Sequence, residues 1–279
     1  MKKTWLITGA SRGFGRIWAE AALERGDQVT ATARKLADVA DLTERFGDAV
    51  LPLALDVTQP DQVRQVVRQA YGHFGKLDVL VNNAGVALLA ATEEASDDQI
   101  RDLFDANYIG MVRVLRAALP HLRQQRSGHI LGVSSGLGIG AMPLIGFYSA
   151  TKWAVEGLHE ALAQEVSAFG IKVTIVEPGA YATDFAKSAR VSEVLGPYAD
   201  FRKQFMERLA SQERGDPEAT AEAILKLVDA DNPPLRLALG SQVLPGARSL
   251  YAERLAAWEA WEDVSNAAQC QPTNSTIAS

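Results

Sequence analysis

Cysteine is almost missing from this chain of 279 residues, because the only one, Cys270, lies in a polar stretch. A single cysteine cannot form a disulfide within the chain, so we expect a cytoplasmic protein. No apolar run approaches the roughly 20 residues that a membrane-spanning helix needs. The opening MKKTWLITGA is basic and then apolar, but its apolar part is too short for a signal peptide and runs into Gly9. We interpret it as a strand.

The chain also has no excess of positively charged residues. The chain has 28 Lys and Arg against 34 Asp and Glu, a formal net charge of -6. Binding to a phosphate backbone needs a basic surface, so we expect no nucleic-acid partner. The four histidines (His73, His121, His129 and His159) do not have metal-ligand spacing, so no metal is predicted. Hydrophobic residues make up 47% of the chain, enough for a sizeable core.

Short β-rich runs alternate along the chain with longer helical patterns. The predicted strands are Thr4–Thr8, Gln28–Ala33, Val50–Ala54, Asp78–Val81, Gly128–Ser134, Ile171–Glu177 and Leu235–Leu239. The predicted helices are Phe14–Arg25, Gln62–Phe74, Asp97–Arg123, Tyr148–Phe169 and Pro217–Val228. This alternation predicts an α/β fold of three layers, with a seven-stranded, parallel, doubly wound sheet and helices on both faces.

Two segments fall outside the alternation. Ala180–Gly215 is a long insertion, and such insertions are usually functional lids, although a helix packed on the surface is the alternative. After Gly240 we predict a helix around Ala247–Asp263. We therefore expect one domain over residues 1–264, which includes the substrate loop (180–215) and a C-terminal extension (241–264), followed by a polar, frayed tail (265–279).

A glycine-rich loop follows the first strand, with the sequence Thr8-Gly9-Ala10-Ser11-Arg12-Gly13-Phe14-Gly15. Glycines allow a tight turn and a close approach of the backbone to a phosphate, which the N-terminus of the next helix attracts. An ordinary turn is the alternative. Its position between the first strand and the first helix of an alternating pattern favours a dinucleotide site.

The end of the second strand indicates which dinucleotide binds. An NAD site usually has an acidic residue there for the ribose 2′-hydroxyl, and an NADP site has a positive charge. Here the strand ends Thr32-Ala33-Arg34, and Arg12 of the glycine loop can approach the same place. We predict NADP(H), with solvated surface arginines as the alternative.

Polar residues follow the next strands at the same edge of the sheet. Asp56-Val57 can bind an adenine amino group or can simply begin a turn. The turn Asn82-Asn83-Ala84-Gly85 directly follows a strand, where open α/β sheets bind their ligands.

Tyr148 and Lys152 are four residues apart in a predicted helix, so their side chains share one face. A lysine ammonium favours the phenolate and so lowers the pKa of tyrosine, which makes the pair a candidate general acid/base. Ser134-Ser135 closes the fifth strand, where a hydroxyl can bind a substrate oxygen. Asn107 interrupts the apolar face of a helix and therefore needs a polar partner.

Together, the motifs resemble those of the short-chain dehydrogenase/reductase family over roughly residues 4–240. They are, in order, TGASRGFG, Asp56, NNAG, Asn107, the serine pair, YSATK, and Pro178-Gly179 with Thr183 beyond. The resemblance implies a Rossmann fold of the single-domain oxidoreductase branch. The run Gly215-Asp216-Pro217 and the segment Pro233–Gly240 are similar to bacterial members grouped near the 17β-hydroxysteroid dehydrogenases, without identifying a steroid as the substrate.

The resemblance also implies the site residues and their roles. The implied catalytic residues are Asn107, Ser135, Tyr148 and Lys152. The implied cofactor-binding residues are Gly9, Ser11, Arg12, Gly13, Phe14, Gly15, Arg34, Asp56, Val57, Asn83, Ala84, Gly85, Tyr148, Lys152, Pro178, Gly179 and Thr183. NADPH is implied to reduce a carbonyl, with Tyr148 giving the proton, Ser135 binding the carbonyl oxygen and Asn107 holding a water that relays protons from Lys152.

The segment Gly136–Phe147 contributes Leu137, Ile139, Met142, Leu144 and Phe147 to an expected apolar substrate wall without Arg or Lys. We therefore expect a small, uncharged, largely apolar ketone, aldehyde or alcohol as the substrate. The resemblance to the family implies a homodimer or homotetramer, formed through the two long helices Asp97–Arg123 and Tyr148–Phe169. The alternatives are an NADP(H)-sensing or scaffolding member without catalysis, and an isomerase that oxidises its substrate transiently.

Overall fold

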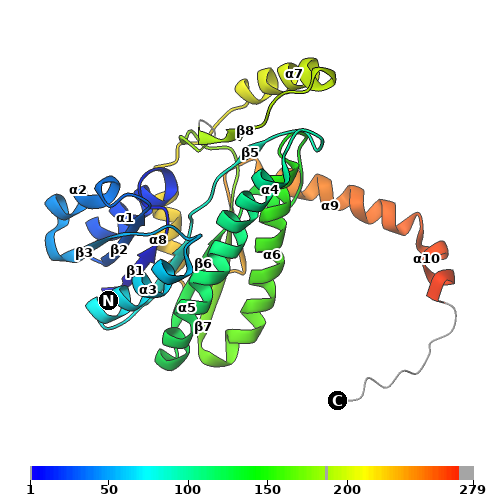
Figure 1. The fold of residues 1–279 in the computed structure, drawn as a ribbon. Helices are drawn as coiled ribbons and strands as arrows, with labels where there is room; N and C mark the ends of the chain where they lie inside the picture. Colours follow the sequence, from blue (N-terminus) through cyan, green and yellow to red (C-terminus); the bar gives the residue numbers. More distant parts are fainter. Residues whose placement is uncertain (1, 186–187, 270–279) are drawn as a thin grey trace.

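The computed structural model describes residues 2–185 and 188–269 (Figure 1). Its centre is a seven-stranded parallel sheet in the order β3-β2-β1-β4-β6-β7-β9. The strands are β1 (Thr4–Ile7), β2 (Gln28–Ala33), β3 (Val50–Ala54), β4 (Val79–Asn82), β6 (Gly128–Val133), β7 (Ile171–Pro178) and β9 (Arg236–Leu239). The predicted doubly wound α/β fold is confirmed, and the strand order changes direction between β1 and β4.

Helices cover both faces of the sheet (Figure 1). One face packs against α1 (Gly13–Glu24), α2 (Ala37–Phe46) and α8 (Thr220–Asp229), and the other against α3 (Pro60–Phe74), α5 (Gly110–Gln125) and α6 (Gly146–Val166). Neighbouring side chains of β1 enter the two different cores, Trp5 and Ile7 on one face and Leu6 on the other. Because side chains alternate along a strand, these apolar runs can fill both layers.

The long helix predicted over Asp97–Arg123 is divided into three parts. It begins as α4 (Asp97–Phe104) behind a capping box, in which Ser96 and Gln99 each bind the other's backbone N–H. A π-helical turn (Asp105–Ile109) follows and contains Asn107. The helix then continues as α5. No helix was predicted over α2, a short helix that buries only Val39 and Leu42.

The 180–215 insertion lies above the carboxyl edge of the sheet as α7 (Ala199–Ala210) and the short strand β8 (Arg190–Val191), which pairs with β5 (Leu88–Leu89) (Figure 1). Its two ends bind each other, because Ala182 N donates to Gly215 O at 2.9 Å and Gly215 N donates to Ala180 O at 2.9 Å. A buried ion pair between Arg202 and Glu94 fixes α7 to the body. The insertion is therefore an anchored cover.

The C-terminal extension starts against the body and then leaves it (Figure 1). Val243, the first residue of α9 (Val243–Glu259), is buried beside Gly136 and Gly179. Farther along, Trp258 and Trp261 are 65% and 67% exposed. The predicted fraying from residue 265 is wrong for 265–269, because α10 (Glu262–Gln269) is helical there. Residues 270–279 of the predicted tail, with Cys270, lie outside the described residues.

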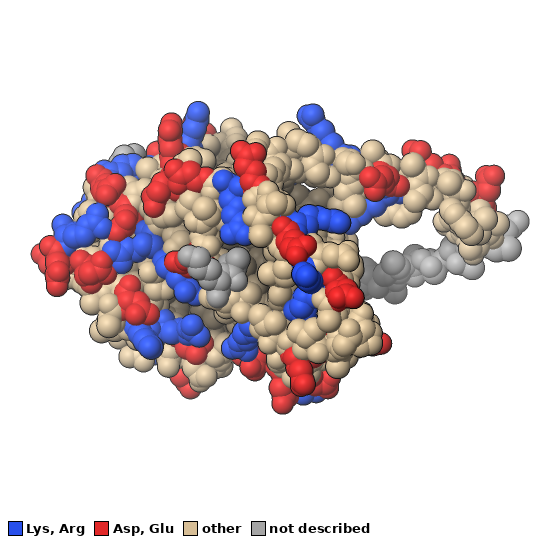
Figure 2. Space-filling model, turned by 90° about the horizontal axis from the view of Figure 1, so that it is seen from above, with Lys and Arg blue, Asp and Glu red and all other residues tan. Residues whose placement is uncertain are grey.

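The surface seen from above has Lys and Arg interspersed with Asp and Glu (Figure 2). This mixture agrees with the small net charge of -6. Among residues 2–185 and 188–269, no helix is both long and apolar enough to cross a bilayer.

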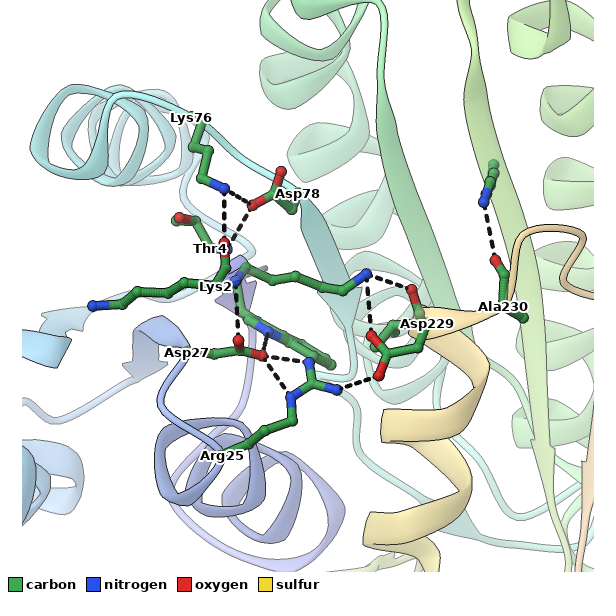
Figure 3. A network of polar contacts seen from close by, with 12 residues as sticks. Lys2, Thr4, Arg25, Asp27, Lys76, Asp78, Asp229 and Ala230 are labelled. Carbon is green, nitrogen blue, oxygen red and sulfur yellow. Dashed lines mark hydrogen bonds and ion pairs between the residues drawn. The ribbon is translucent and has the colours of Figure 1, made fainter.

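A polar network joins the elements at the amino edge of the sheet, opposite the insertion (Figure 3). Asp27, which is 3% exposed, accepts hydrogen bonds from Lys3 N at 2.9 Å and from Trp5 Nε1 at 2.9 Å. Arg25 pairs with Asp27 and also with Asp229 at the end of α8, at 2.8 Å. The start of β1 is thereby tied to the α1–β2 turn and to α8.

Replacing Asp27 should test this network. Asp27→Ala leaves two buried N–H donors without their acceptor and Arg25 without its buried partner, so we expect the free energy of unfolding to fall by about 2–4 kcal/mol. Chemical denaturation measures the change. The control Asp231→Ala alters an exposed loop residue and should stay within about 0.5 kcal/mol of the original protein. Equal losses in the two variants would contradict the proposed role of the network.

Candidate active site

A cavity of about 660 Å³ opens at the carboxyl edge of the sheet, below the insertion. Of all the residues predicted to form the site, only Gly15 and Asn107 do not line it. The lining residues from the prediction are Gly9, Ser11, Arg12, Gly13, Phe14, Arg34, Asp56, Val57, Asn83, Ala84, Gly85, Ser135, Tyr148, Lys152, Pro178, Gly179 and Thr183. Residues far apart in sequence thus converge at the edge where open α/β sheets bind ligands.

The glycine loop is braced by the turn that follows β4. Asn83 Nδ2 donates to the carbonyl oxygens of Thr8 and Gly9, both at 3.0 Å, and Thr8 Oγ1 accepts from the N–H groups of Asn83 and Ala84 at 3.0 Å. A Cβ on Gly15 would lie 2.3 Å from Gly9 O and 2.6 Å from Asn83 Nδ2. Gly15 therefore does not line the cavity but packs against the loop backbone, and only a residue without a side chain fits there.

Gly9 and Gly13 have φ of 71° and 55°, in the left-handed region that favours glycine. The loop leads directly into the N-terminus of α1, where free backbone N–H groups and the helix dipole favour an anion. These features fit the pyrophosphate of a dinucleotide.

Arg12 and Arg34 are both exposed on the rim of the cavity. Within the described part of the chain neither makes an ion pair, although most other arginines do. The end of β2 has no acidic residue beside them, since Ala33 is followed by Arg34 and Lys35. Two unpaired guanidinium groups at this edge fit an additional phosphate on the ribose.

Asp56 lines the cavity, but one of its carboxylate oxygens is used locally. Its Oδ1 accepts from Thr58 N at 2.9 Å and from Thr58 Oγ1 at 2.8 Å. The turn-forming role left open by the sequence is therefore present, and it does not prevent the other oxygen from binding a ligand.

Tyr148 lies in the first turn of α6 and is 6% exposed. Burial raises the pKa of its phenol above the ordinary value, and the Ser135 hydroxyl beside it acts in the opposite direction. The lowered pKa predicted from the neighbouring lysine is wrong here, because removing the phenolate from water outweighs the nearby positive charge. The phenol is thus protonated at neutral pH.

Lys152 is buried one turn farther along α6. Its Nζ donates to Val133 O at 2.8 Å and lies 5.5 Å from the centre of the Tyr148 ring. Burial lowers the pKa of Lys152 to about 8, and the charge of Glu156 partly offsets this shift. The ammonium form therefore still predominates at neutral pH.

The two serines at the end of β6 differ. Ser135 caps a short 3-10 turn (Gly136–Gly138), its Oγ accepts from Leu137 N at 3.1 Å, and its hydroxyl proton remains available for a ligand. Ser134 Oγ is buried and has no partner among the described residues.

Asn107 is fully buried in the π-helical turn. Its Oδ1 accepts from Val86 N at 2.8 Å, and its Nδ2 donates to Val86 O at 2.8 Å and to Thr151 Oγ1 at 3.1 Å. The side chain thus fixes the backbone that follows the Asn-Asn-Ala-Gly turn, and one acceptor position of Oδ1 remains for a water. Single π-helical turns of this kind are frequent at functional sites.

The apolar wall of the cavity differs from the prediction. Of the five apolar residues expected from 136–147, only Leu137 lines it, because Met142 and Leu144 pack against Phe205 of the insertion and Phe147 belongs to another cluster. The insertion itself contributes Phe185, Met206 and Leu209. Arg190 and Arg214 also reach the cavity, so it is not free of positive charge.

Sequence reasoning missed the charged residues directly behind Lys152. Glu156, Glu177 and Arg236 form a mostly buried cluster between α6 and the sheet. Two signals were present: a glutamate directly after the apolar pair Ile175-Val176 near the end of a strand, and another glutamate one helical turn after Lys152.

Comparison with known proteins agrees with this arrangement. Residues 3–193 match the short chain dehydrogenase family. The oxidoreductase BOA17 of Botryotinia fuckeliana is 44% identical over 95% of this chain and 98% of its own length. The 3-ketodihydrosphingosine reductase of Bacteroides thetaiotaomicron is 40% identical over 85% of this chain and 88% of its own length.

Solved structures of other proteins have a similar fold. A short-chain dehydrogenase from Streptomyces avermitilis is 40% identical, superposes with a TM-score of 0.89 and covers 96% of this chain and 98% of its own. ElxO with NADP bound is 28% identical, with a TM-score of 0.75 over 88% of this chain and 100% of its own. The chain belongs to the short-chain dehydrogenase/reductase family of oxidoreductases.

Gly15→Ala should distort the braced loop. The added Cβ meets three atoms at less than 3 Å, two of the Gly9 backbone and the hydrogen-bonded Asn83 Nδ2, so we expect the free energy of unfolding to fall by about 2–3 kcal/mol. The matched control is Gly72→Ala in α3, where a Cβ meets no atom within 4 Å. It should be neutral or stabilise by up to about 1 kcal/mol. Thermal and chemical denaturation compare the two, and unchanged stability of Gly15→Ala would contradict the packing argument.

Proposed function

We propose that this protein is an NADP(H)-dependent oxidoreductase that interconverts a ketone or aldehyde and the corresponding alcohol. One observation carries the proposal: a protonated, buried phenol (Tyr148), a serine hydroxyl (Ser135) and a buried ammonium (Lys152) meet in one cavity that also contains a phosphate-binding loop. The Bacteroides relative is a 3-ketodihydrosphingosine reductase, which supports a carbonyl as the reacting group.

The chain's residues fit NADP(H). The glycine loop and the N-terminus of α1 would hold the pyrophosphate, and Arg12 and Arg34 would hold the 2′-phosphate. Lys152 would bind the nicotinamide ribose, and Thr183 with the backbone near Pro178 would hold the carboxamide. When bound, the reduced cofactor supplies the hydride that the carbonyl carbon accepts.

Protein groups supply the proton and bind the oxygen. Tyr148 donates its phenolic proton to the carbonyl oxygen as the alcohol forms, and Ser135 donates a hydrogen bond to that oxygen. Loss of one such donor commonly costs about 3 kcal/mol of transition-state stabilisation. The positive charge of Lys152 stabilises the phenolate left on Tyr148, and Asn107 binds a water through which a proton returns.

For the substrate we propose a small, uncharged, largely apolar carbonyl compound or alcohol. Leu88, Phe185, Met206 and Leu209 support this choice on the insertion side of the cavity. We also propose that the protein is similar to the bacterial 17β-hydroxysteroid dehydrogenase group and lies in the cytoplasm. We propose that it forms a homodimer or homotetramer and has no nucleic-acid or membrane partner.

The alternative is a member that binds NADP(H) and only senses it or serves as a scaffold. Every catalytic position is filled, which favours the enzyme. Following nicotinamide absorbance with a panel of ketones and aldehydes separates the two: tight NADPH binding without any turnover favours the sensor. An isomerase would turn over without consuming external NADPH stoichiometrically.

Tyr148→Phe removes the phenolic proton but keeps the ring, so kcat should fall by a factor of about 100 to 10,000. NADPH affinity, measured by fluorescence titration, should change less than about threefold, because the ring packing remains. The control Tyr198→Phe alters a phenol that does not line the cavity and should keep its activity. An active Tyr148→Phe variant would show that the proposed proton donor is wrong.

Arg34→Ala should test the choice of cofactor. Loss of a charge-assisted bond to a 2′-phosphate should weaken NADPH binding about 10- to 100-fold and leave NADH binding nearly unchanged. The neighbouring Lys35→Ala, which alters an exposed residue that does not line the cavity, serves as the control. Parallel loss of both dinucleotides in Arg34→Ala would exclude a specific phosphate contact.

A further inference from the structure

A cluster of charged side chains is packed behind Lys152, away from the cavity. Glu156 follows Lys152 by one turn of α6, Glu177 lies near the end of β7, and Arg236 begins β9. Arg236 Nε lies 3.2 Å from Glu156 Oε2 and 3.6 Å from Glu177 Oε1. The glutamate side chains are only 11% and 4% exposed.

The cluster has more buried acid than one guanidinium can satisfy. Glu156 Oε1 and Glu177 Oε1 are both buried, and neither has a hydrogen-bond donor among the described residues. Both carboxyl groups lie against the same Arg236 Nε, and burial, followed by the charge of Glu156, raises the pKa of Glu177 to about 7 while Arg236 opposes the shift. Two ionised carboxylates in contact repel each other, whereas one proton held between them supplies the missing donor.

The surroundings contain few other groups that could supply charge. On α6, Lys152 and Glu160 lie one turn to either side of Glu156, and the His159 ring packs against Gly132 of β6. Among the described residues, Ser134 Oγ and Glu156 Oε1 lie beside Gly138, and the Val133 carbonyl binds Lys152. Burial lowers the pKa of His159 to about 4, so this residue is neutral at physiological pH. Glu160 binds Arg236 Nη2 at 2.6 Å but is 54% exposed, so its charge is screened by water.

The remaining negative charge of the pair therefore acts mainly on Lys152. Lys152 is itself 3% exposed, and among the described residues its hydrogen-bond partner is the neutral Val133 carbonyl. In such a dry site an ammonium loses its proton easily, and the nearby Glu156 opposes that loss.

We propose that Glu156 is a positioning residue for the reaction: Glu156 and Glu177 share one proton beside Arg236, and their remaining negative charge keeps Lys152 protonated at the pH where the enzyme works. The inference rests on the proposed carbonyl reduction for its catalytic consequence only. The shared proton and the charge of Lys152 can be measured without turnover.

The sign of the pH effect follows from where the negative charge of the pair remains. In Glu156→Gln that charge stays on Glu177, which a second acid no longer repels, and of the two acids only Glu156 raises the pKa of Lys152. The pKa of Lys152 therefore falls further below about 8. Lys152 then loses its charge at a lower pH, and the alkaline limb of the rate profile for ketone reduction should move down by roughly one pH unit. Rates on the acidic side should stay within about twofold, and rates above the limb should fall about tenfold.

The experiment compares Glu156→Gln, Glu177→Gln and the matched control Glu160→Gln, which alters a more exposed acid on the same arginine. Profiles of kcat and kcat/KM are recorded from about pH 5 to about pH 9. The limb should move in Glu156→Gln and stay in Glu160→Gln. Equal movement in both variants, or a rate loss at every pH without movement, would overturn the proposal.

Two spectroscopic readouts separate this inference from the proposed function. Infrared difference spectra should show a protonated carboxyl that ionises near pH 7 in the original protein, and this band should be absent in Glu177→Gln. NMR of ¹³C-labelled lysine, assigned with Lys152→Met, should show the lower pKa in Glu156→Gln. If no carbonyl is reduced but both signals appear, the proposed function fails and the acid pair stands. If neither signal appears, the acid pair fails even where the enzyme is active.

Discussion

The site depends on the removal of Tyr148 and Lys152 from water. Burial raises the pKa of the phenol and so keeps it in its protonated, proton-donating form, and it lowers the pKa of the lysine to about 8, close to the pH at which the charge is lost. The sheet makes this possible, because Val133 at the end of β6 provides the carbonyl that Lys152 Nζ binds. The same burial explains why charged groups behind the lysine have an effect on it: in a dry interior their fields are weakly screened.

Much of the fold could be predicted from the sequence, because the strands between β1 and β9 are apolar runs separated by helical periods. Elements with little apolar burial escaped, as α2 did with only Val39 and Leu42 buried. The pairing of β5 with β8 escaped for a different reason. Each strand has two residues, and Leu88 and Arg190 meet only through the tertiary arrangement of the insertion.

The candidate site was predictable where a motif occupies consecutive residues, as in the glycine loop and in Tyr148 to Lys152. It was not predictable where the effect depends on what surrounds a residue. The direction of the Tyr148 pKa shift is one case, since helical spacing indicates a nearby charge but cannot give the extent of burial. The Glu177 carboxyl is another, because its partners Glu156 and Arg236 come from other elements.

The amino and carboxyl edges of the sheet differ in how firmly the neighbouring elements are fixed to them. At the amino edge, Asp27 and Arg25 tie β1 to α8 through buried or partly buried bonds (Figure 3). At the carboxyl edge, the insertion is fixed at its neck and by Glu94 with Arg202, while Phe185, Leu195 and Phe201 are partly exposed. A segment with few buried apolar contacts has a low local stability and opens more readily than the body. Local displacement of this cover can therefore open the cavity, while the glycine loop and Lys152 stay fixed by the sheet.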